Sequence, residues 1–167
     1  MINRTAEVTV RRLLKGFPVV TITGPRQSGK TTLAKLIFAS KPYVSLEDPD
    51  ERLFAREDPR GFLARFSKGA VLDEIQRAPD LFSYLQTIVD KDARMGRFIL
   101  TGSQQFGLIS HITQSLAGRS AFVELLPFTI GEIREAKSLP SHLDAMMHKG
   151  SYPALYDREI APRQWFS

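Results

Sequence analysis

The chain has 167 residues, a length that fits one domain of ordinary size and argues against two. Hydrophobic residues make up 43% and charged residues 25%, which excludes a disordered or collagen-like chain. The sequence contains no cysteine and no apolar run of the roughly 18 to 20 residues that a membrane-spanning helix needs. It therefore excludes disulfides, thiolate metal sites and a membrane span, and we expect a cytoplasmic protein.

The first third of the chain alternates helical and strand patterns. Residues 6–14 predict a helix, and Phe17–Thr23 is a β-branched run typical of a buried central strand. A glycine-rich turn follows, after which apolar residues recur at helical spacing over Lys30–Phe38. Tyr43–Leu46 then predicts a second short strand. This order indicates a parallel sheet flanked by helices.

The middle of the chain continues the alternation. Residues 50–66 predict a helical region that breaks at Pro59, and Ala70–Leu72 predicts a third strand. A helix begins near Pro79, and Arg97–Thr101 predicts the fourth strand.

The last part supplies a fifth strand. Ser110–Ala117 predicts a helix that ends at Gly118, and Ser120–Leu126 predicts a strand. After Gly131 the pattern weakens into helical pieces. Five strands with helices between them predict a three-layer α/β domain with a mostly parallel five-stranded sheet.

The turn after the first strand matches a phosphate-binding loop, G-x-x-x-x-G-K-[ST], in every defined position. Its glycines give the backbone the freedom to wrap a phosphate with inward N–H groups. The helix that follows presents its N-terminal dipole to negative charge. We therefore expect ATP to bind the following residues: Gly24, Pro25, Arg26, Gln27, Ser28, Gly29, Lys30, Thr31 and Thr32.

Two side chains of this loop have defined chemical roles. Lys30 is expected to reach the β- and γ-phosphates, and the hydroxyl of Thr31 is expected to ligate Mg²⁺. A chance match in a turn is the alternative, but the β-branched strand before the loop and the helix after it argue against chance.

An acidic pair follows the third strand. In P-loop ATPases an aspartate at such a strand end holds Mg²⁺, and the adjacent glutamate activates the attacking water. We therefore predict Asp73 as a metal residue and Glu74 as the catalytic base. The alternative is that both acids merely cap the next segment.

Hydroxyl groups follow the apolar residues Phe98, Ile99 and Leu100 of the fourth strand. Because ligands of open α/β sheets bind at the carboxyl edge, Thr101 or Ser103 is a candidate to orient the water or sense the γ-phosphate. A turn-forming Thr-Gly-Ser explains the same residues almost as well.

The net charge of the chain does not identify a binding partner. The formal charge of +5 suits a polyanion, but the basic residues are scattered and no run of five or more occurs. A DNA or protein partner is therefore kept as a hypothesis. The three histidines, His111, His142 and His148, show no ligand spacing.

Several segments together resemble a known group, the AAA-like ATPases of bacteria and archaea whose longer members carry a C-terminal domain of unknown function. The resemblance covers nearly the whole chain in the right order: Gly24–Thr32, Val71–Gln76, Ile99–Ser103, Leu116–Arg119 and Gly150–Pro153. It implies the additional-strand sheet, in which the strand ending at Thr101 separates the phosphate-loop strand from the strand that carries the acids.

The resemblance also implies a domain plan. Residues 1–130 would form the ATPase core, and residues 131–167 would begin a helical lid or a linker to a C-terminal domain that a complete member carries beyond Ser167. In AAA-like ATPases the place of Arg119 commonly holds an arginine presented to the ATP of a neighbouring subunit, which implies a homo-oligomer. The alternatives are that Arg119 pairs with an acid such as Glu124 or contacts nucleotide in its own chain.

Three functions remain open from the sequence. The leading hypothesis is an ATPase that uses ATP and Mg²⁺ and whose hydrolysis drives or times a conformational change. The second is a nucleotide-dependent switch that binds DNA or a protein with negligible turnover. The third is a small-molecule kinase, which ranks lower because the sequence offers no obvious acceptor site or arginine-rich lid.

Overall fold

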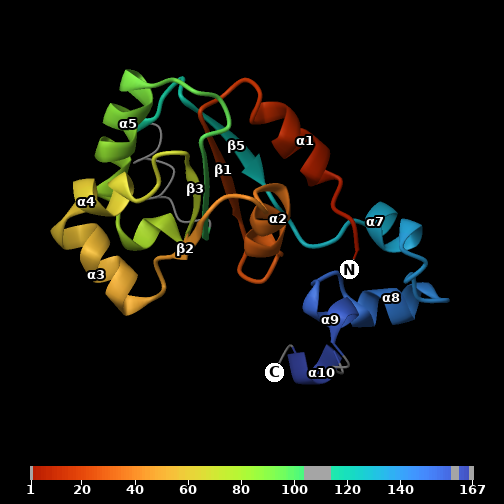
Figure 1. Cartoon of the computed structure of the whole chain (residues 1–167). Coiled ribbons are helices and arrows are strands. Elements are labelled where there is room, and N and C mark those ends of the chain that lie inside the picture. Colours follow the sequence, from red (N-terminus) through yellow and green to blue (C-terminus); the bar gives the residue numbers. More distant parts are fainter. Residues whose placement is uncertain (1, 104–113, 159–161, 166–167) are drawn as a thin grey trace.

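The computed structural model describes residues 2–103, 114–158 and 162–165. Its centre is a parallel sheet of five strands (Figure 1) with the order β2-β3-β4-β1-β5. The strand β4 therefore lies between β1 and β3, as the resemblance to AAA-like ATPases implied. The bounds are β1 Val19–Gly24, β2 Tyr43–Ser45, β3 Ala70–Asp73, β4 Phe98–Ser103 and β5 Ser120–Glu124.

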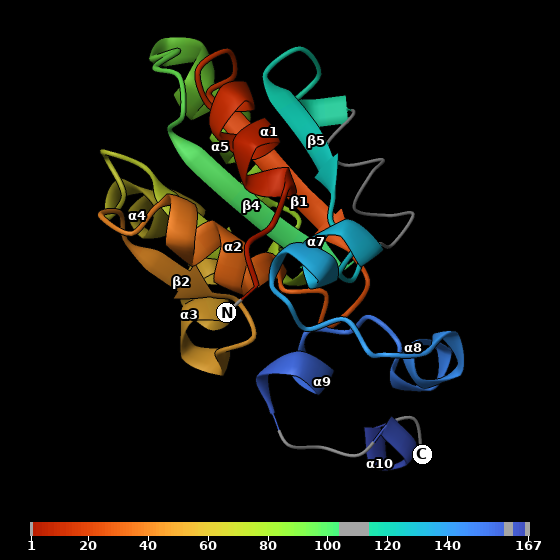
Figure 2. The same ribbon diagram turned by 90° about the vertical axis from the view of Figure 1, so that its right-hand side faces the viewer.

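Helices cover both faces of the sheet, which confirms the three-layer α/β prediction (Figures 1 and 2). One face packs against α1 (Ala6–Leu13) and α2 (Lys30–Ile37). The other packs against α3 (Pro49–Glu57), α4 (Pro59–Ala64) and α5 (Leu81–Lys91). Successive residues of a strand point to opposite faces, so β1, β3 and β4 are buried at every position and contribute to both apolar cores.

The predicted helical break at Pro59 is confirmed, and each half has its own start signal. Asp48 accepts a hydrogen bond from the backbone N–H of Asp50 at 2.9 Å, and Asp58 accepts one from Gly61 at 2.9 Å. A proline follows each of these aspartates as the first helical residue. The two caps divide residues 49–64 into two short helices instead of one long one.

Two predicted boundaries shift by two residues. The first strand begins at Val19 and not at Phe17, because Pro18 lacks an N–H and its carbonyl oxygen accepts hydrogen bonds from Arg97 and Phe98. The helix expected from Pro79 begins at Leu81. It follows a 3-10 turn, η1, over Ile75–Arg77.

The helix expected over residues 110–117 lies largely outside the described residues. Gly118, predicted to end it, has a φ of 71°, the left-handed conformation of a helix-ending glycine.

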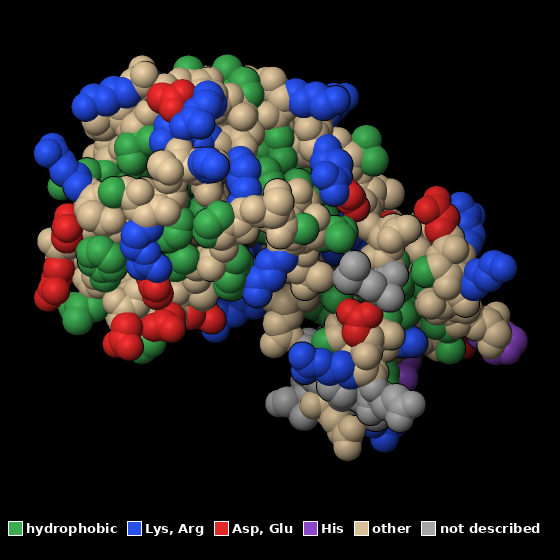
Figure 3. Space-filling view, in the orientation of Figure 1, with side chains coloured by type: hydrophobic (Ala, Val, Ile, Leu, Met, Phe, Trp, Pro, Cys, Tyr) green, Lys and Arg blue, Asp and Glu red, His purple; other side chains and the backbone are tan. Residues whose placement is uncertain are grey.

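The C-terminal pieces are α7 (Ile130–Glu135), α8 (Leu143–Lys149), α9 (Ala154–Asp157) and α10 (Pro162–Trp165). Figure 2 shows them below the carboxyl edge of the sheet. In Figure 3 basic side chains gather along the upper rim of the molecule and acidic side chains along the lower left. No helix in the described ranges has the length and apolarity required to span a membrane.

Candidate nucleotide-binding site

The phosphate loop joins β1 to α2 and depends on its two glycines. Gly24 has a φ of 141°, and a Cβ at this position would lie 2.2 Å from the carbonyl oxygen of Leu125. Gly29 has a φ of 93° directly before the first residue of α2. Other residues rarely adopt these angles, so both positions require glycine. The loop thus stands at the N-terminus of a helix, as a phosphate site requires.

Lys30 lies inside the loop, and only 5% of its surface is exposed. Its ammonium group donates to the carbonyl oxygens of Gly24, at 3.1 Å, and Pro25, at 2.7 Å. Burial lowers the pKa of Lys30, an effect that the nearby carboxylates of Glu74 and Asp73 oppose. The loop therefore holds a cation that can exchange these two carbonyls for phosphate oxygens.

Asp73 ends β3 and receives hydrogen bonds from two other elements. The Thr31 hydroxyl donates to its two carboxylate oxygens at 3.0 Å and 3.2 Å, and the Thr101 hydroxyl donates to Oδ1. Oxygen donors of this kind suit Mg²⁺, which keeps several water molecules and binds phosphate oxygens. In the described part of the chain no three His, Cys, Asp or Glu residues form a metal cage. A cation held here would complete its shell with oxygens from nucleotide and water.

Tyr43 is a contact that the sequence interpretation missed. Its hydroxyl donates to Asp73 Oδ2 at 2.8 Å from the neighbouring strand β2. Burial and the nearby carboxylate raise the pKa of Tyr43 to about 12, so the phenol stays a donor. A tyrosine at the start of a strand carries no motif, and only the pairing of β2 with β3 brings it to the acid.

Glu74 follows Asp73 in a left-handed conformation, with φ 56° and ψ 46°. Its backbone N–H donates to the Thr101 hydroxyl at 3.3 Å. Its carboxylate accepts a hydrogen bond from the side-chain amide of Gln76, which also donates to the Ser103 hydroxyl at 3.1 Å. The predicted residues Thr101 and Ser103 thus lie beside the acidic pair, at the carboxyl edge of β4. Their roles as sensors stay predictions, as does the role of Glu74 as a base.

A cavity of about 520 Å³ lies over the phosphate loop. Seven of the predicted residues line it: Arg26, Gln27, Gly29, Lys30, Thr31, Thr32 and Glu74. Ser28 is buried, and its hydroxyl has no partner within the described residues. The sequence interpretation missed the lining residues that come from α9 and its flanks, and also one acid after β2: Pro153, Ala154, Asp157, Arg158 and Glu47.

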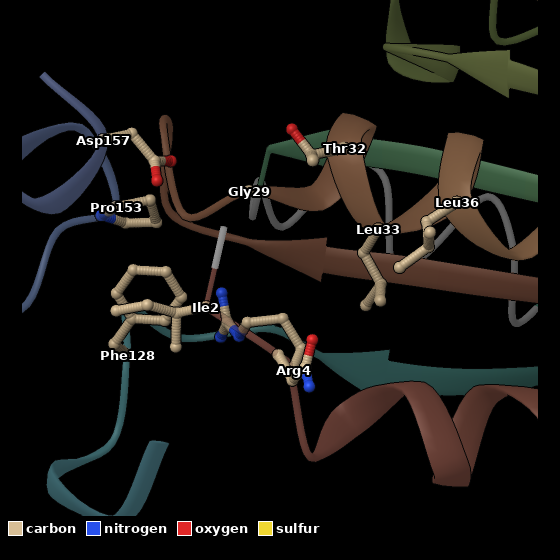
Figure 4. A pocket seen from close by; sticks show the side chains of 10 residues that line it. Ile2, Arg4, Gly29, Thr32, Leu33, Leu36, Phe128, Pro153 and Asp157 are labelled. Carbon is tan, nitrogen blue, oxygen red and sulfur yellow. The ribbon is translucent and has the colours of Figure 1, made fainter. Parts of the chain in front are cut away.

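A smaller, mostly apolar cavity of about 50 Å³ adjoins the loop (Figure 4). Ile2 and Phe128 form one side, Leu33 of α2 forms another, and Pro153 closes it from the C-terminal segment. Gly29, Thr32, Pro153 and Asp157 line both cavities, so the two lie side by side.

Arg4 ties this apolar cavity to the loop. Its guanidinium donates to the carbonyl oxygen of Ser28 at 2.8 Å and lies 4.9 Å from the centre of the Phe128 ring. It also pairs with the buried carboxylate of Glu132 in α7, at 3.3 Å. The same carboxylate accepts from the backbone N–H of Thr5 at 2.8 Å. Glu132 therefore joins α7 to the N-terminal segment, and Arg4 links that segment to the loop.

Arg119 lies away from these residues. It directly precedes β5, so it stands at the amino edge of the sheet, whereas the loop follows β1 at the carboxyl edge, roughly 15 to 20 Å away along the strand. Its guanidinium pairs with Asp90 of α5 at 2.5 Å and 3.0 Å. A contact with nucleotide in its own chain is therefore wrong for this structure, and the ion pair is with Asp90 instead of Glu124. A role toward a neighbouring subunit stays a prediction.

The sequence matches the AAA domain family over residues 16–134. This match covers the loop, the acidic pair and the fourth strand that carries Thr101. The chain belongs to the AAA domain family. Nucleotide binding is the activity that such a P-loop domain supports at a general level.

Two uncharacterised relatives, from Mycobacterium bovis and Mycobacterium tuberculosis, are each 39% identical over 132 residues. The match covers 78% of this chain but only 30% of each relative's length. Among solved structures, a Walker-type ATPase of Pyrococcus abyssi gives a TM-score of 0.59 at 17% identity, covering 92% of this chain and 65% of that one. A RuvB variant of Thermotoga maritima gives 0.52 at 21% identity, covering 80% and 49%. These two likenesses support the fold.

Proposed function

We propose that this domain binds ATP with Mg²⁺ and hydrolyses it to ADP and phosphate. The hydrogen bond between Thr31 and Asp73 carries the proposal, because it brings together two oxygen ligands, one from helix α2 and one from strand β3, at the mouth of a phosphate loop. A phosphate loop with no carboxylate beside it would bind a phosphate anion without a metal ion. The carboxylate of Asp73 adds a ligand for Mg²⁺, so the loop is suited to a triphosphate that carries Mg²⁺.

The cavities suggest how ATP fits. The β- and γ-phosphates enter the loop, and the Lys30 ammonium leaves the carbonyls of Gly24 and Pro25 to meet them. Arg26 and Arg158 also line this cavity and are candidates to contact phosphate oxygens. The adenine would enter the apolar cavity, between Ile2 and Pro153, once these side chains part.

The acidic pair and the loop divide the chemistry between them. Thr31 and Asp73 would hold Mg²⁺, which neutralises charge on the phosphates when it is bound. Glu74 accepts a proton from a water molecule whose oxygen attacks the γ-phosphorus. The bond from that phosphorus to the bridging oxygen breaks, and its electron pair leaves with ADP. Lys30 stabilises the negative charge on the transferred group.

The output is proposed to be a conformational change in the C-terminal helices. Pro153, Asp157 and Arg158 border the phosphate cavity, so loss of the γ-phosphate would remove a partner of this segment. Residues 131–167 would then act as a lid or a linker. An attached domain, a protein partner or a neighbouring subunit would respond to the change in position of residues 131–167.

The test combines calorimetric titration of ATP, with and without Mg²⁺, and phosphate release measured without any added acceptor. We expect Mg²⁺-dependent binding and steady release of phosphate in the purified chain. Binding without release would reduce the proposal to a nucleotide switch. Release only on addition of a hydroxyl acceptor would favour a kinase, and absence of binding would refute the whole assignment.

A further inference from the structure

The connectors that lead into the five strands carry an unusual share of the positive charge. We call them the amino rim: residues 13–18, 37–42, 64–69, 91–97 and 116–119. Every connector places a basic residue one to four positions before its strand. These residues are Lys15, Lys41, Lys68, Arg97 and Arg119.

The amino rim is one continuous edge of the molecule. Because all five strands are parallel, their amino ends meet at the edge opposite the phosphate loop. Five strands about 4.8 Å apart span roughly 20 Å. In Figure 1 the connectors before β1, β4 and β5 lie along the upper edge, and Figure 3 shows basic side chains on that edge in the same orientation.

The charge on this edge accounts for the surplus of the whole chain. The amino rim holds eight basic residues, and Arg65, Lys91 and Arg94 are the three not yet named. Three acids pair with them, namely Asp92 inside the rim, Asp90 with Arg119 and Glu51 with Arg65. Eight minus three leaves a surplus of five, which equals the formal charge of the chain. The other fifteen basic and fifteen acidic residues therefore balance.

Within the described residues, no further acidic side chain pairs with the remaining positive charge of the amino rim. Lys15, Lys68 and Lys91 are exposed and have no ion-pair or hydrogen-bond partner there. Lys41 is half-buried and donates to the carbonyl oxygens of Gly96 and Arg97. Burial and the nearby charges of Arg94 and Arg97 lower the pKa of Lys41. The free domain thus holds like charges together, a cost that a bound anion would remove.

A cavity between α4 and α5 opens beside this edge, with a volume of about 750 Å³. Its lining combines the basic side chains of Arg60, Lys91 and Arg97 with the ring of Tyr84 and the hydroxyl of Thr87. Arg97 is 9% exposed, and its Nη atoms donate to the carbonyl oxygens of Ser67 and Asp92. Its guanidinium is thereby fixed in place at the wall of the cavity.

We propose that the amino rim binds the phosphate backbone of a nucleic acid, on the edge opposite the ATP site. One DNA strand presents about six phosphates over roughly 20 Å, which matches the length of the rim. Positive charge spread along a whole edge of the sheet suits a polyanion. Such contacts position a nucleic acid without reading its sequence.

Other anionic partners fit less well. Within the amino rim Met95 is the large apolar side chain that is clearly exposed, so the rim has little to insert into a lipid surface. An acidic peptide would need only a short cluster of charge, whereas this charge spreads along the whole edge.

The experiment measures the affinity of the purified chain for a fluorescent duplex of about 20 base pairs, by anisotropy, from about 50 to about 200 mM salt. Four or five neutralised phosphates predict a slope of log K against log salt near −4, and a loss of roughly 200-fold across this range. The matching single strand and an RNA duplex are titrated in parallel. Four or five contacts predict a slope near −3 for the single strand. Binding to any of the three probes with the slope expected for it supports the rim, and the order of the affinities identifies the preferred form.

Two matched double variants decide where the nucleic acid binds. Lys68→Glu/Lys91→Glu changes two exposed rim lysines and is expected to weaken binding at least tenfold and to reduce the slope by about 2. Arg134→Glu/Lys137→Glu makes the same charge change at the exposed end of α7 and should alter affinity less than about twofold. Equal losses in the two variants would overturn the proposal, because total charge alone would then explain binding.

Two further measurements distinguish binding at the amino rim from binding at the phosphate loop and from binding to a lipid surface. Lys30→Ala should bind DNA as the parent does, since the phosphate loop lies at the opposite edge. If Lys30→Ala abolishes binding and the rim variant does not, the nucleic acid occupies the loop and the proposal fails. Vesicles of phosphatidylcholine and phosphatidylserine serve as the lipid probe. Binding to vesicles without binding to any nucleic acid would also refute it.

Discussion

The hydroxyl of Thr31 donates to the carboxylate of Asp73 across 42 residues of sequence, at 3.0 Å and 3.2 Å. The first residue belongs to the helix that the phosphate loop opens, and the second ends β3. The two meet because α2 crosses the carboxyl edge of β4, whose Thr101 binds the same carboxylate. The proposed Mg²⁺ site therefore depends on residues from three separate elements.

Lys30→Ala is expected to weaken ATP binding about 100-fold or more, because it removes the charge that meets the terminal phosphates. The fold should persist, since the loop carbonyls that Lys30 now contacts can bind water. Calorimetric titration measures the affinity. Lys68→Ala is the control, because it removes an exposed lysine before β3, away from the loop, and it should bind ATP as the parent does. An unchanged affinity in Lys30→Ala would remove the central claim.

Glu74→Gln is expected to keep ATP and Mg²⁺ but to lose hydrolysis by a factor of about 10² or more. The amide keeps the shape of the side chain while losing the charge that accepts a proton from water. Phosphate release and calorimetry together separate turnover from binding. Glu47→Gln alters another acid of the same cavity and should leave the rate within about twofold. Turnover of Glu74→Gln at the parent rate would leave Glu74 as a strand cap.

Gln76→Ala is expected to lower turnover about tenfold without changing ATP affinity, since its amide holds the Glu74 carboxylate and the Ser103 hydroxyl together. Gln76 is thus a positioning residue for Glu74. The double variant with Glu74→Gln provides the check. If Gln76 acts through Glu74, adding Gln76→Ala to Glu74→Gln should cost nothing further. Additive losses would show that Gln76 has an independent role.

Glu132 should make stability depend on pH. Burial raises its pKa, but hydrogen bonds from Thr129 and Thr5 and the charge of Arg4 outweigh this and hold the pKa below its usual value of 4.5. A lowered pKa adds stability above about pH 4.5, and that stability is lost as pH falls through the folded-state value. Glu132→Gln is therefore expected to lose about 2 kcal/mol of unfolding free energy at pH 7.

Urea unfolding of parent and variant at pH 7, 5 and below 4 measures this effect. The difference between the two proteins should shrink as the solution becomes acidic, because the parent then loses the charge that the variant lacks. Glu135→Gln, on the exposed side of the same helix, should match the parent at every pH. A constant difference for Glu132→Gln would show that shape, and not charge, is responsible.

The local features of the site were predictable from sequence. The phosphate loop is a contiguous motif, and its context of β-branched strand and amphipathic helix is equally local. Asp73 follows an apolar strand, so its place at the carboxyl edge follows from the parallel sheet. The strand order came from the resemblance to AAA-like ATPases, because hydrophobic patterns do not specify which strands pair.

The remaining contacts depend on tertiary packing. Tyr43 reaches Asp73 only because β2 pairs with β3, and the bond between Arg4 and Glu132 spans 128 residues. Arg158 enters the phosphate cavity from a weakly patterned segment. The left-handed backbone of Glu74 has no sequence signal, since glutamate seldom adopts it. These features require the three-dimensional arrangement of the chain.

Arg119 provides the last prediction. Its pair with Asp90 is exposed, so its contribution to stability is small and its release costs little. If a neighbouring subunit presents its ATP to this edge, Arg119 would leave Asp90 and stabilise charge on the transferring phosphoryl group. We expect Arg119→Ala to bind ATP normally and to lose most hydrolysis. Mixing it with Lys30→Ala should restore partial activity, because one subunit then supplies the intact site and the other the arginine.

The mixture is measured by phosphate release over a range of protein concentrations, with Asp90→Ala as the matched control. Asp90→Ala breaks the same ion pair but keeps the arginine, so it should retain activity if Arg119 acts on a neighbour. Asp90→Ala should lose hydrolysis as Arg119→Ala does if the fold requires the ion pair between Asp90 and Arg119. A parent whose specific activity does not change with concentration, and a mixture that stays inactive, would together exclude the role in a neighbouring subunit. Arg119 would then be a residue that fixes the end of α5 against the start of β5.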